Sequence, residues 1–144
     1  MSEVPENLVE SRVRVRYAET DQMGVVYHAN YLVWFEVGRV EFIRHFGMDY
    51  RTMEREDGIM IAVVEVSLRY KSPARYDDEL AVRTRLVSMR GSIIRFGYQI
   101  VRVSDETLLA EGETTHIVVS REMKRAAFPE KYTKLFAHLL HPMG

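Results

Sequence analysis

Cysteine is absent from this sequence of 144 residues, and neither sign of charge is in excess. The absence of cysteine excludes disulfides, thiolate zinc sites, iron–sulfur clusters and cysteine nucleophiles, and it fits the cytoplasmic location that we expect. Twenty Lys and Arg residues against 21 Asp and Glu residues give a net charge of −1. Because a strongly basic surface is missing, no nucleic-acid partner is predicted.

Long apolar runs are also missing. Runs such as Ile59–Val64 are far shorter than the roughly 20 residues that a membrane-spanning helix needs. The N-terminus has neither the basic start nor the apolar stretch of a signal peptide. We therefore expect no transmembrane segment. The composition, with 47% hydrophobic and 28% charged residues, predicts a single globular domain over residues 1–144.

Alternation of apolar and polar residues predicts most of the chain's secondary structure. Five segments carry the period of a half-buried strand: Ser11–Tyr17, Ile59–Tyr70, Glu79–Met89, Ile93–Val103 and Leu108–Val119. The last four segments are joined by short connections, which predicts that successive strands are antiparallel neighbours.

One long helix is predicted between the first two strands. Apolar residues recur at spacings near three and four from Asn30 to Phe46, with Asn30 as the expected N-cap and Gly47 at the expected end. Arg51–Gly58 is predicted to be a charged loop, and Pro129 to open a short terminal helix. This order predicts an α+β fold in which a curled antiparallel sheet of about five strands packs against one helix.

The residues that suggest chemistry lie in the loop of residues 18–29, just before the long helix. Asp21 places a carboxylate there, and Gly24 is expected to adopt a backbone shape that other residues resist. The free N–H groups of a helix start favour the oxyanion of a reacting carbonyl. Asp21 would attack the carbonyl carbon or activate a water, and His28 would contribute its N–H, its imidazole or both. The alternative is a structural role, since an Asp before a helix is usually a turn or cap residue.

Two motifs resemble those of a known family. The run Thr20–Tyr31, followed by Phe35 and Arg39, resembles the signature of the 4-hydroxybenzoyl-CoA thioesterase family of hot-dog-fold proteins, and within it the Tol–Pal-associated acyl-CoA thioesterase branch. A weaker likeness continues through Tyr76–Leu80, and the resemblance extends over nearly the whole chain. It implies a hot-dog fold, and a homodimer that pairs its sheets edge to edge and assembles further into a homotetramer.

The resemblance also implies which residues form the site. Asp21 aligns with the family's catalytic carboxylate, and the backbone N–H of His28 with the group that polarises the thioester carbonyl. Residues expected to contact the acyl-CoA substrate are Gly24, Val25, Tyr27 and Asn30 in the same motif, and Arg90 and Ser92 at a turn between strands. Glu36 on the predicted helix is a reserve candidate, because another hot-dog branch uses a helix carboxylate as its catalyst. The resemblance calls for no cofactor and no metal.

Three functions remain open at this point. The leading hypothesis is hydrolysis of an acyl-CoA thioester to a carboxylate and CoA, with Asp21 as general base or nucleophile. A hot-dog dehydratase is the second, although Ala29–Tyr31 lacks the Pro and Gly expected after its His. The third is a non-catalytic protein that binds acyl-CoA or acyl carrier protein, which has no need for a carboxylate near a helix N-terminus. The sequence leaves open which acyl group is used and whether CoA or acyl carrier protein carries it.

Overall fold

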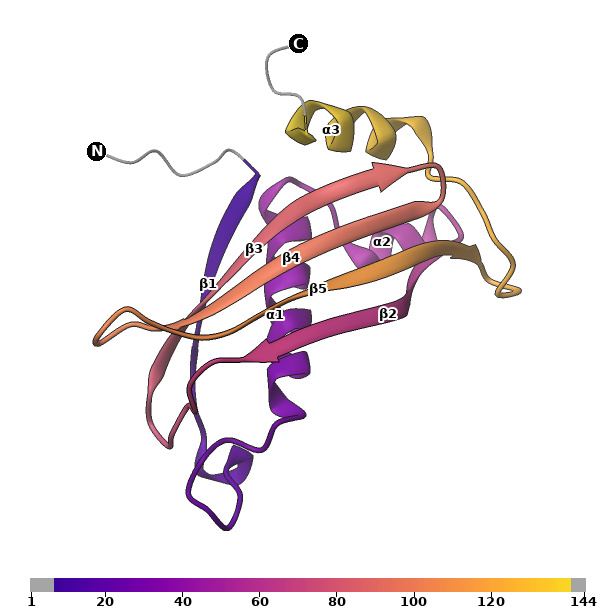
Figure 1. Cartoon of the computed structure of the whole chain (residues 1–144). Helices are drawn as coiled ribbons and strands as arrows, with labels where there is room; N and C mark the ends of the chain where they lie inside the picture. Colours follow the sequence, from indigo (N-terminus) through magenta and orange to yellow (C-terminus); the bar gives the residue numbers. More distant parts are fainter. Residues whose placement is uncertain (1–6, 141–144) are drawn as a thin grey trace.

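A computed structural model describes residues 7–140, and within them five strands form one antiparallel sheet (Figure 1). The strands are β1 (Leu8–Arg14), β2 (Ile59–Tyr70), β3 (Glu79–Arg90), β4 (Ile93–Arg102) and β5 (Thr107–Ser120). Their order in the sheet is β1-β3-β4-β5-β2, so β1 and β2 form the two edges. The predicted α+β class, with about five antiparallel strands, is confirmed.

The long helix α1 (Asn30–His45) crosses one face of the curled sheet (Figure 1). Its apolar face packs on the central strands: Phe35 stacks on Tyr98 with 4.2 Å between ring centroids, and Phe42 meets Phe96 edge-on at 5.5 Å. Gly38 lets the helix approach closely, because a Cβ at this position would collide with Thr84 and Val82 of β3. The interior therefore lies between α1 and the sheet, and most of the apolar helix residues are buried.

Two helix predictions need correction. Asn30 is the first helical residue and not the cap, because its side-chain amide donates to the Glu19 carbonyl at 2.9 Å while Ala29 occupies the cap position. A short helix, α2 (Tyr50–Arg55), takes up the first five residues of the predicted charged loop Arg51–Gly58. Asp49 caps α2 by accepting from the Arg51 N–H, and a single buried residue, Met53, anchors it. One apolar anchor creates no periodic pattern, which explains why sequence reasoning missed this helix.

The two ends of the described chain differ in how well they were predicted. Strand β1 begins earlier than expected and stops at Arg14, three residues before the predicted end at Tyr17. Tyr17 instead opens a 3-10 turn, η1 (Tyr17–Glu19). Helix α3 (Glu130–Leu140) follows Pro129 as predicted and packs over the end of β3 (Figure 1). None of the helices between residues 7 and 140 has the length and apolar character needed to cross a lipid bilayer.

Candidate active site

The 20–28 loop, which precedes α1, is held in a tight shape around Asp21. The Asp21 N–H donates to the Val25 carbonyl at 2.8 Å, and the Gly24 N–H donates to the Asp21 carbonyl at 3.0 Å. Gly24 has φ +80°, a backbone region that side-chain-bearing residues rarely adopt, as its predicted role requires. The Asp21 carboxylate accepts the Met23 N–H at 2.8 Å and is partly accessible to solvent. The loop therefore presents a fixed, ionisable carboxylate.

Glu19 is a supporting residue that sequence reasoning missed. Only 6% of Glu19 is exposed, and its carboxylate accepts the Arg16 N–H at 2.8 Å while pairing with the Arg16 guanidinium at 3.5 Å. Its carbonyl accepts the Tyr27 N–H at 2.8 Å as well as the Asn30 amide. Glu19 thus ties the beginning of the loop to the beginning of α1. Asn30, which was predicted to contact substrate, serves this connection in the structure.

The start of α1 presents backbone donors at His28. Within the described residues, the N–H groups of His28 and Ala29 donate to no acceptor, as expected for the first residues before a helix. The His28 carbonyl accepts the Tyr70 hydroxyl at 2.9 Å, which fixes the direction of this peptide. Partial burial raises the pKa of Tyr70, so its hydroxyl stays protonated as the donor. These free N–H groups can stabilise an oxyanion.

A cavity of about 260 Å³ opens beside these donors. Its lining comes from the 20–28 loop, the first turn of α1, the end of β2 and the loop that follows β2: Val26, His28, Tyr31, Tyr70, Lys71, Ser72 and Pro73. Tyr31 lies at its inner side and accepts the Ala74 N–H at 3.1 Å, and burial raises the pKa of its hydroxyl. His28 therefore borders a mostly apolar space, whereas Asp21, Gly24, Val25 and Tyr27 lie in the loop outside this lining.

Arg90 and Ser92 lie far from Asp21 within one chain. Both belong to the β3–β4 turn, where the Ser92 carbonyl accepts the Val118 N–H at 2.9 Å. Val118 pairs with Ile61 near the start of β2, whereas Tyr70 at the end of β2 contacts His28. Ile61 and Tyr70 are about 30 Å apart at roughly 3.3 Å per strand residue. One chain does not bring the two groups of predicted site residues together.

A second cavity of about 260 Å³ lies between α1, α2 and the start of β2. Glu36, the reserve candidate, lines it together with Arg39, Tyr50 and Glu54. Arg39 is only 9% exposed, and its guanidinium donates to the Tyr98 hydroxyl at 3.2 Å. The Arg39 guanidinium is a buried charge in the interior between α1 and the sheet. In the sequence, Arg39 was singled out only by its position in the first motif. No group of three or more metal-ligating side chains occurs within residues 7–140.

Known proteins match this fold and this sequence. Residues 15–136 match the family model of the thioesterase-like superfamily. The putative acyl-CoA thioesterase YneP of Bacillus subtilis is 41% identical over 126 residues, covering 84% of this chain and 90% of that protein. The acyl-CoA thioester hydrolase YbgC of Escherichia coli is 37% identical over 125 residues, covering 86% of this chain and 92% of that protein.

A solved structure supports the predicted fold. The 4-hydroxybenzoyl-CoA thioesterase from a Pseudomonas species superposes with a TM-score of 0.83 at 20% identity, covering 90% of this chain and 99% of that one. At this identity the likeness shows the fold, and the predicted hot-dog fold is confirmed. Together with the family match over residues 15–136, these relatives show that the chain belongs to the thioesterase-like superfamily of hot-dog proteins.

Proposed function

We propose that this chain hydrolyses acyl-CoA thioesters and that Asp21 carries the chemistry. The observation that supports this most directly is the placement of the Asp21 carboxylate in the short loop that leads into the free N–H groups of His28 and Ala29. A carboxylate and an oxyanion site are the two parts that acyl transfer requires. The relatives that are named acyl-CoA thioesterases favour the thioester over other acyl compounds.

The reaction is proposed to begin with the thioester carbonyl oxygen at the His28 N–H. In one route the Asp21 carboxylate removes a proton from water, hydroxide adds to the carbonyl carbon, and CoA leaves as the thiolate that takes up that proton. In the other route Asp21 adds directly, expels the CoA thiolate and forms an acyl anhydride, which water then cleaves. Both routes give a free carboxylate and CoA without a cofactor.

We further propose that two copies complete each site by pairing their β2 edges. Strand β2 is an edge strand, and the side chains of Val63, Val64 and Val66 in its centre are exposed. Antiparallel pairing of two such strands places the start of β2 in one copy beside the end of β2 in the other. The β3–β4 turn with Arg90 and Ser92 would then approach the other copy's 20–28 loop. Arg90 is suited to a CoA phosphate, and further assembly into a homotetramer stays a prediction.

Thiol release from a panel of acyl-CoAs tests the proposed activity. The panel spans short aliphatic, long aliphatic and aromatic acyl groups, each also presented on acyl carrier protein. We expect turnover on at least one compound, and the preferred compound identifies the acyl class and the carrier. Stoichiometric binding without thiol release on every compound would contradict the proposal and would favour the non-catalytic binding protein.

A single turnover in heavy-oxygen water tests whether Asp21 is the nucleophile. The anhydride route ends with water attacking one of its two carbonyls, and attack on the enzyme carbonyl leaves label in Asp21, detectable by mass spectrometry of its peptide. The general-base route puts all label in the released acid. Label in Asp21 therefore establishes the nucleophile. Label in the acid alone contradicts an anhydride that water opens at the Asp21 carbonyl.

A further inference from the structure

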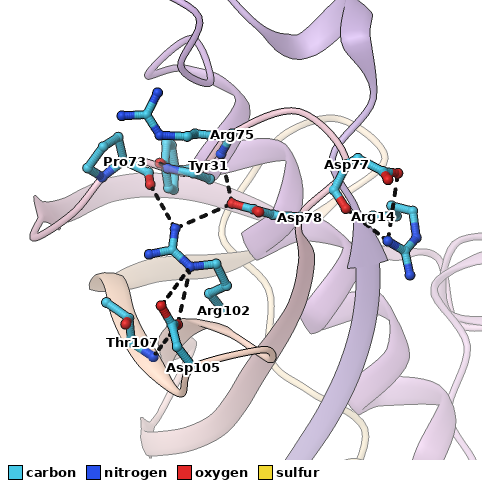
Figure 2. A network of polar contacts seen from close by, with 10 residues as sticks. Arg14, Tyr31, Pro73, Arg75, Asp77, Asp78, Arg102, Asp105 and Thr107 are labelled. Atoms are coloured by element: carbon cyan, nitrogen blue, oxygen red, sulfur yellow. Dashed lines mark hydrogen bonds and ion pairs between the residues drawn. The ribbon is translucent and has the colours of Figure 1, made fainter.

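The second motif, Tyr76–Leu80, contributes no residue to the site described so far. Its Asp78 nevertheless forms an ion pair with Arg102 next to that site. The Asp78 carboxylate accepts the Arg75 N–H at 2.9 Å and pairs with the Arg102 guanidinium at 3.4 Å (Figure 2). The same guanidinium nitrogen lies 3.4 Å from the Pro73 carbonyl oxygen. The side chains of Arg102 and Asp78 are 19% and 22% exposed, so solvent screens this pair less than the protein's surface pairs.

These contacts fix the 71–78 loop, which connects β2 to β3. Arg102 is the last residue of β4, a central strand, and it reaches two points of the loop, Pro73 and Asp78 (Figure 2). Nη1 of Arg102 contacts both acceptors, while Nε of the same guanidinium contacts Asp105. A Lys side chain is one atom shorter and would not reach the position of Nη1. The loop is therefore anchored to the rigid centre of the sheet.

The 71–78 loop in turn holds the loop that carries Asp21. The Ala74 carbonyl accepts the Val26 N–H at 2.9 Å, and Arg75 forms a β-bridge with Val25. The carbonyl of Val25 is the acceptor for the Asp21 N–H at 2.8 Å. Hydrogen bonds, joined by short stretches of backbone, thus connect Arg102 through the 71–78 loop to the backbone of Asp21.

We propose that the Asp78–Arg102 pair positions Asp21 for catalysis through the 71–78 loop. The proposal rests on the catalytic role of Asp21 proposed above, and neither Asp78 nor Arg102 touches substrate in it. Reacting groups must be held in near-attack geometry, and a displacement of about 1 Å from a remote change can cost on the order of 10²-fold in rate. Loss of the pair frees the loop to shift, which moves Asp21 without removing it.

Three single variants and one control test whether the ion pair supports catalysis. Asp78→Asn and Arg102→Met each remove the ion pair, and we expect kcat to fall about tenfold with a smaller change in KM. Arg102→Lys keeps the charge but reaches less far than Nη1 of Arg102, so its kcat should lie between those of wild type and Arg102→Met. Asp105→Asn is the matched control, because Asp105 also pairs with Arg102 at 3.2 Å but lies in the exposed β4–β5 turn. Its kcat should equal that of wild type.

A double-mutant cycle separates positioning of Asp21 from a general loss of structure. We expect Arg102→Met to change the residual kcat of Asp21→Asn by less than about twofold. Displacement of residue 21 affects catalysis only when that residue carries the carboxylate. An equal fractional loss in both backgrounds would overturn the proposal. Wild-type kcat in Asp78→Asn and Arg102→Met would also overturn it. A normal rate in Asp21→Asn would instead overturn the proposed function, so the two failures are distinguishable.

Discussion

At the scale of single residues, the missing side chain of Gly38 sets the distance between α1 and the sheet. An ideal Cβ at this position would lie 2.8 Å from a Val82 methyl carbon and still nearer to the Thr84 hydroxyl. Thr84 and Val82 belong to the buried inner face of β3 and have little room to retreat. Close packing thus requires glycine at a helix position where alanine would otherwise be preferred.

Gly38→Ala tests this requirement. Alanine has the better helix propensity by about 1 kcal/mol, whereas overpacking a filled interior costs roughly 1–3 kcal/mol. We expect the collision to dominate and the free energy of unfolding to fall, as measured by denaturant titration at one protein concentration. A more stable variant would contradict the close approach of α1 to β3.

The residues of the site could be predicted from the sequence only where their roles are local. The positive φ of Gly24 follows from its place in a tight loop, and the structure places it as expected. The role of Glu19 could not be predicted, because its burial depends on contacts with Arg16, Tyr27 and Asn30 that exist only once the loop has folded. Asn30 shows the same effect. Asparagine is a typical helix-capping residue, but here its side-chain amide donates to the Glu19 carbonyl instead.

At the scale of elements, buried polar side chains connect α1, β4 and β5. The Tyr98 hydroxyl lies 2.6 Å from the Thr114 hydroxyl, which lies 2.7 Å from the His116 ring, and Arg39 completes the chain. Burial, and then the nearby Arg39 guanidinium, lowers the pKa of His116 from its ordinary value of 6.5 to about 3. His116 is therefore neutral in the folded protein, which leaves Arg39 as the one cation among these side chains.

Neutral His116 makes stability depend on pH. Between its ordinary pKa of 6.5 and about 3, the unfolded chain binds a proton that the folded protein does not. The contribution of neutral His116 to the free energy of unfolding is complete above pH 6.5. It is lost as the pH falls toward 3, at up to about 1.4 kcal/mol per pH unit. Urea unfolding from pH 7 to 4 should show this loss in the wild-type protein. In His116→Gln, the free energy of unfolding should fall less steeply with decreasing pH. Equal slopes in the two proteins would contradict a neutral, buried His116.

The elements themselves were predictable to different degrees, for physical reasons. The five strands and α1 are long enough for the alternating and helical periods of their apolar residues to be recognised in the sequence. Helix α2 has six residues and one buried anchor, Met53, so its formation depends on the cap at Asp49 and on tertiary packing. The 3-10 turn at Tyr17–Glu19 likewise depends on a local contact, because the Glu19 carboxylate accepts the Arg16 N–H at the start of the turn.

At the scale of the whole molecule, the separation of Arg90 from Asp21 points to a site shared between copies. The family resemblance aligned both residues with one site but did not say which copy supplies each. Within one chain they lie at opposite ends of β2, and the exposed valines of β2 offer an apolar surface for a second copy. The sequence therefore names candidate residues for this site without indicating their arrangement between copies.

Val64→Lys tests the proposed pairing. Val64 is 59% exposed in the centre of β2, and a lysine there would place a charge in the proposed interface. We expect a lower mass by analytical ultracentrifugation and a loss of thioesterase activity in the same variant. Met123→Lys is the control, because Met123 is similarly exposed but lies in the β5–α3 connection. An unchanged mass for Val64→Lys, or an equal loss in the control, would contradict pairing through β2.

The most direct test of the central claim compares kcat of Asp21→Asn with that of Glu36→Gln on the preferred thioester. Each variant replaces a carboxylate by an amide of the same size, one in the 20–28 loop and the other on α1. We expect Asp21→Asn to lose on the order of 10²–10⁴-fold and Glu36→Gln to lose far less. A near-normal rate in Asp21→Asn beside a collapse in Glu36→Gln would contradict the account and assign the chemistry to the helix carboxylate.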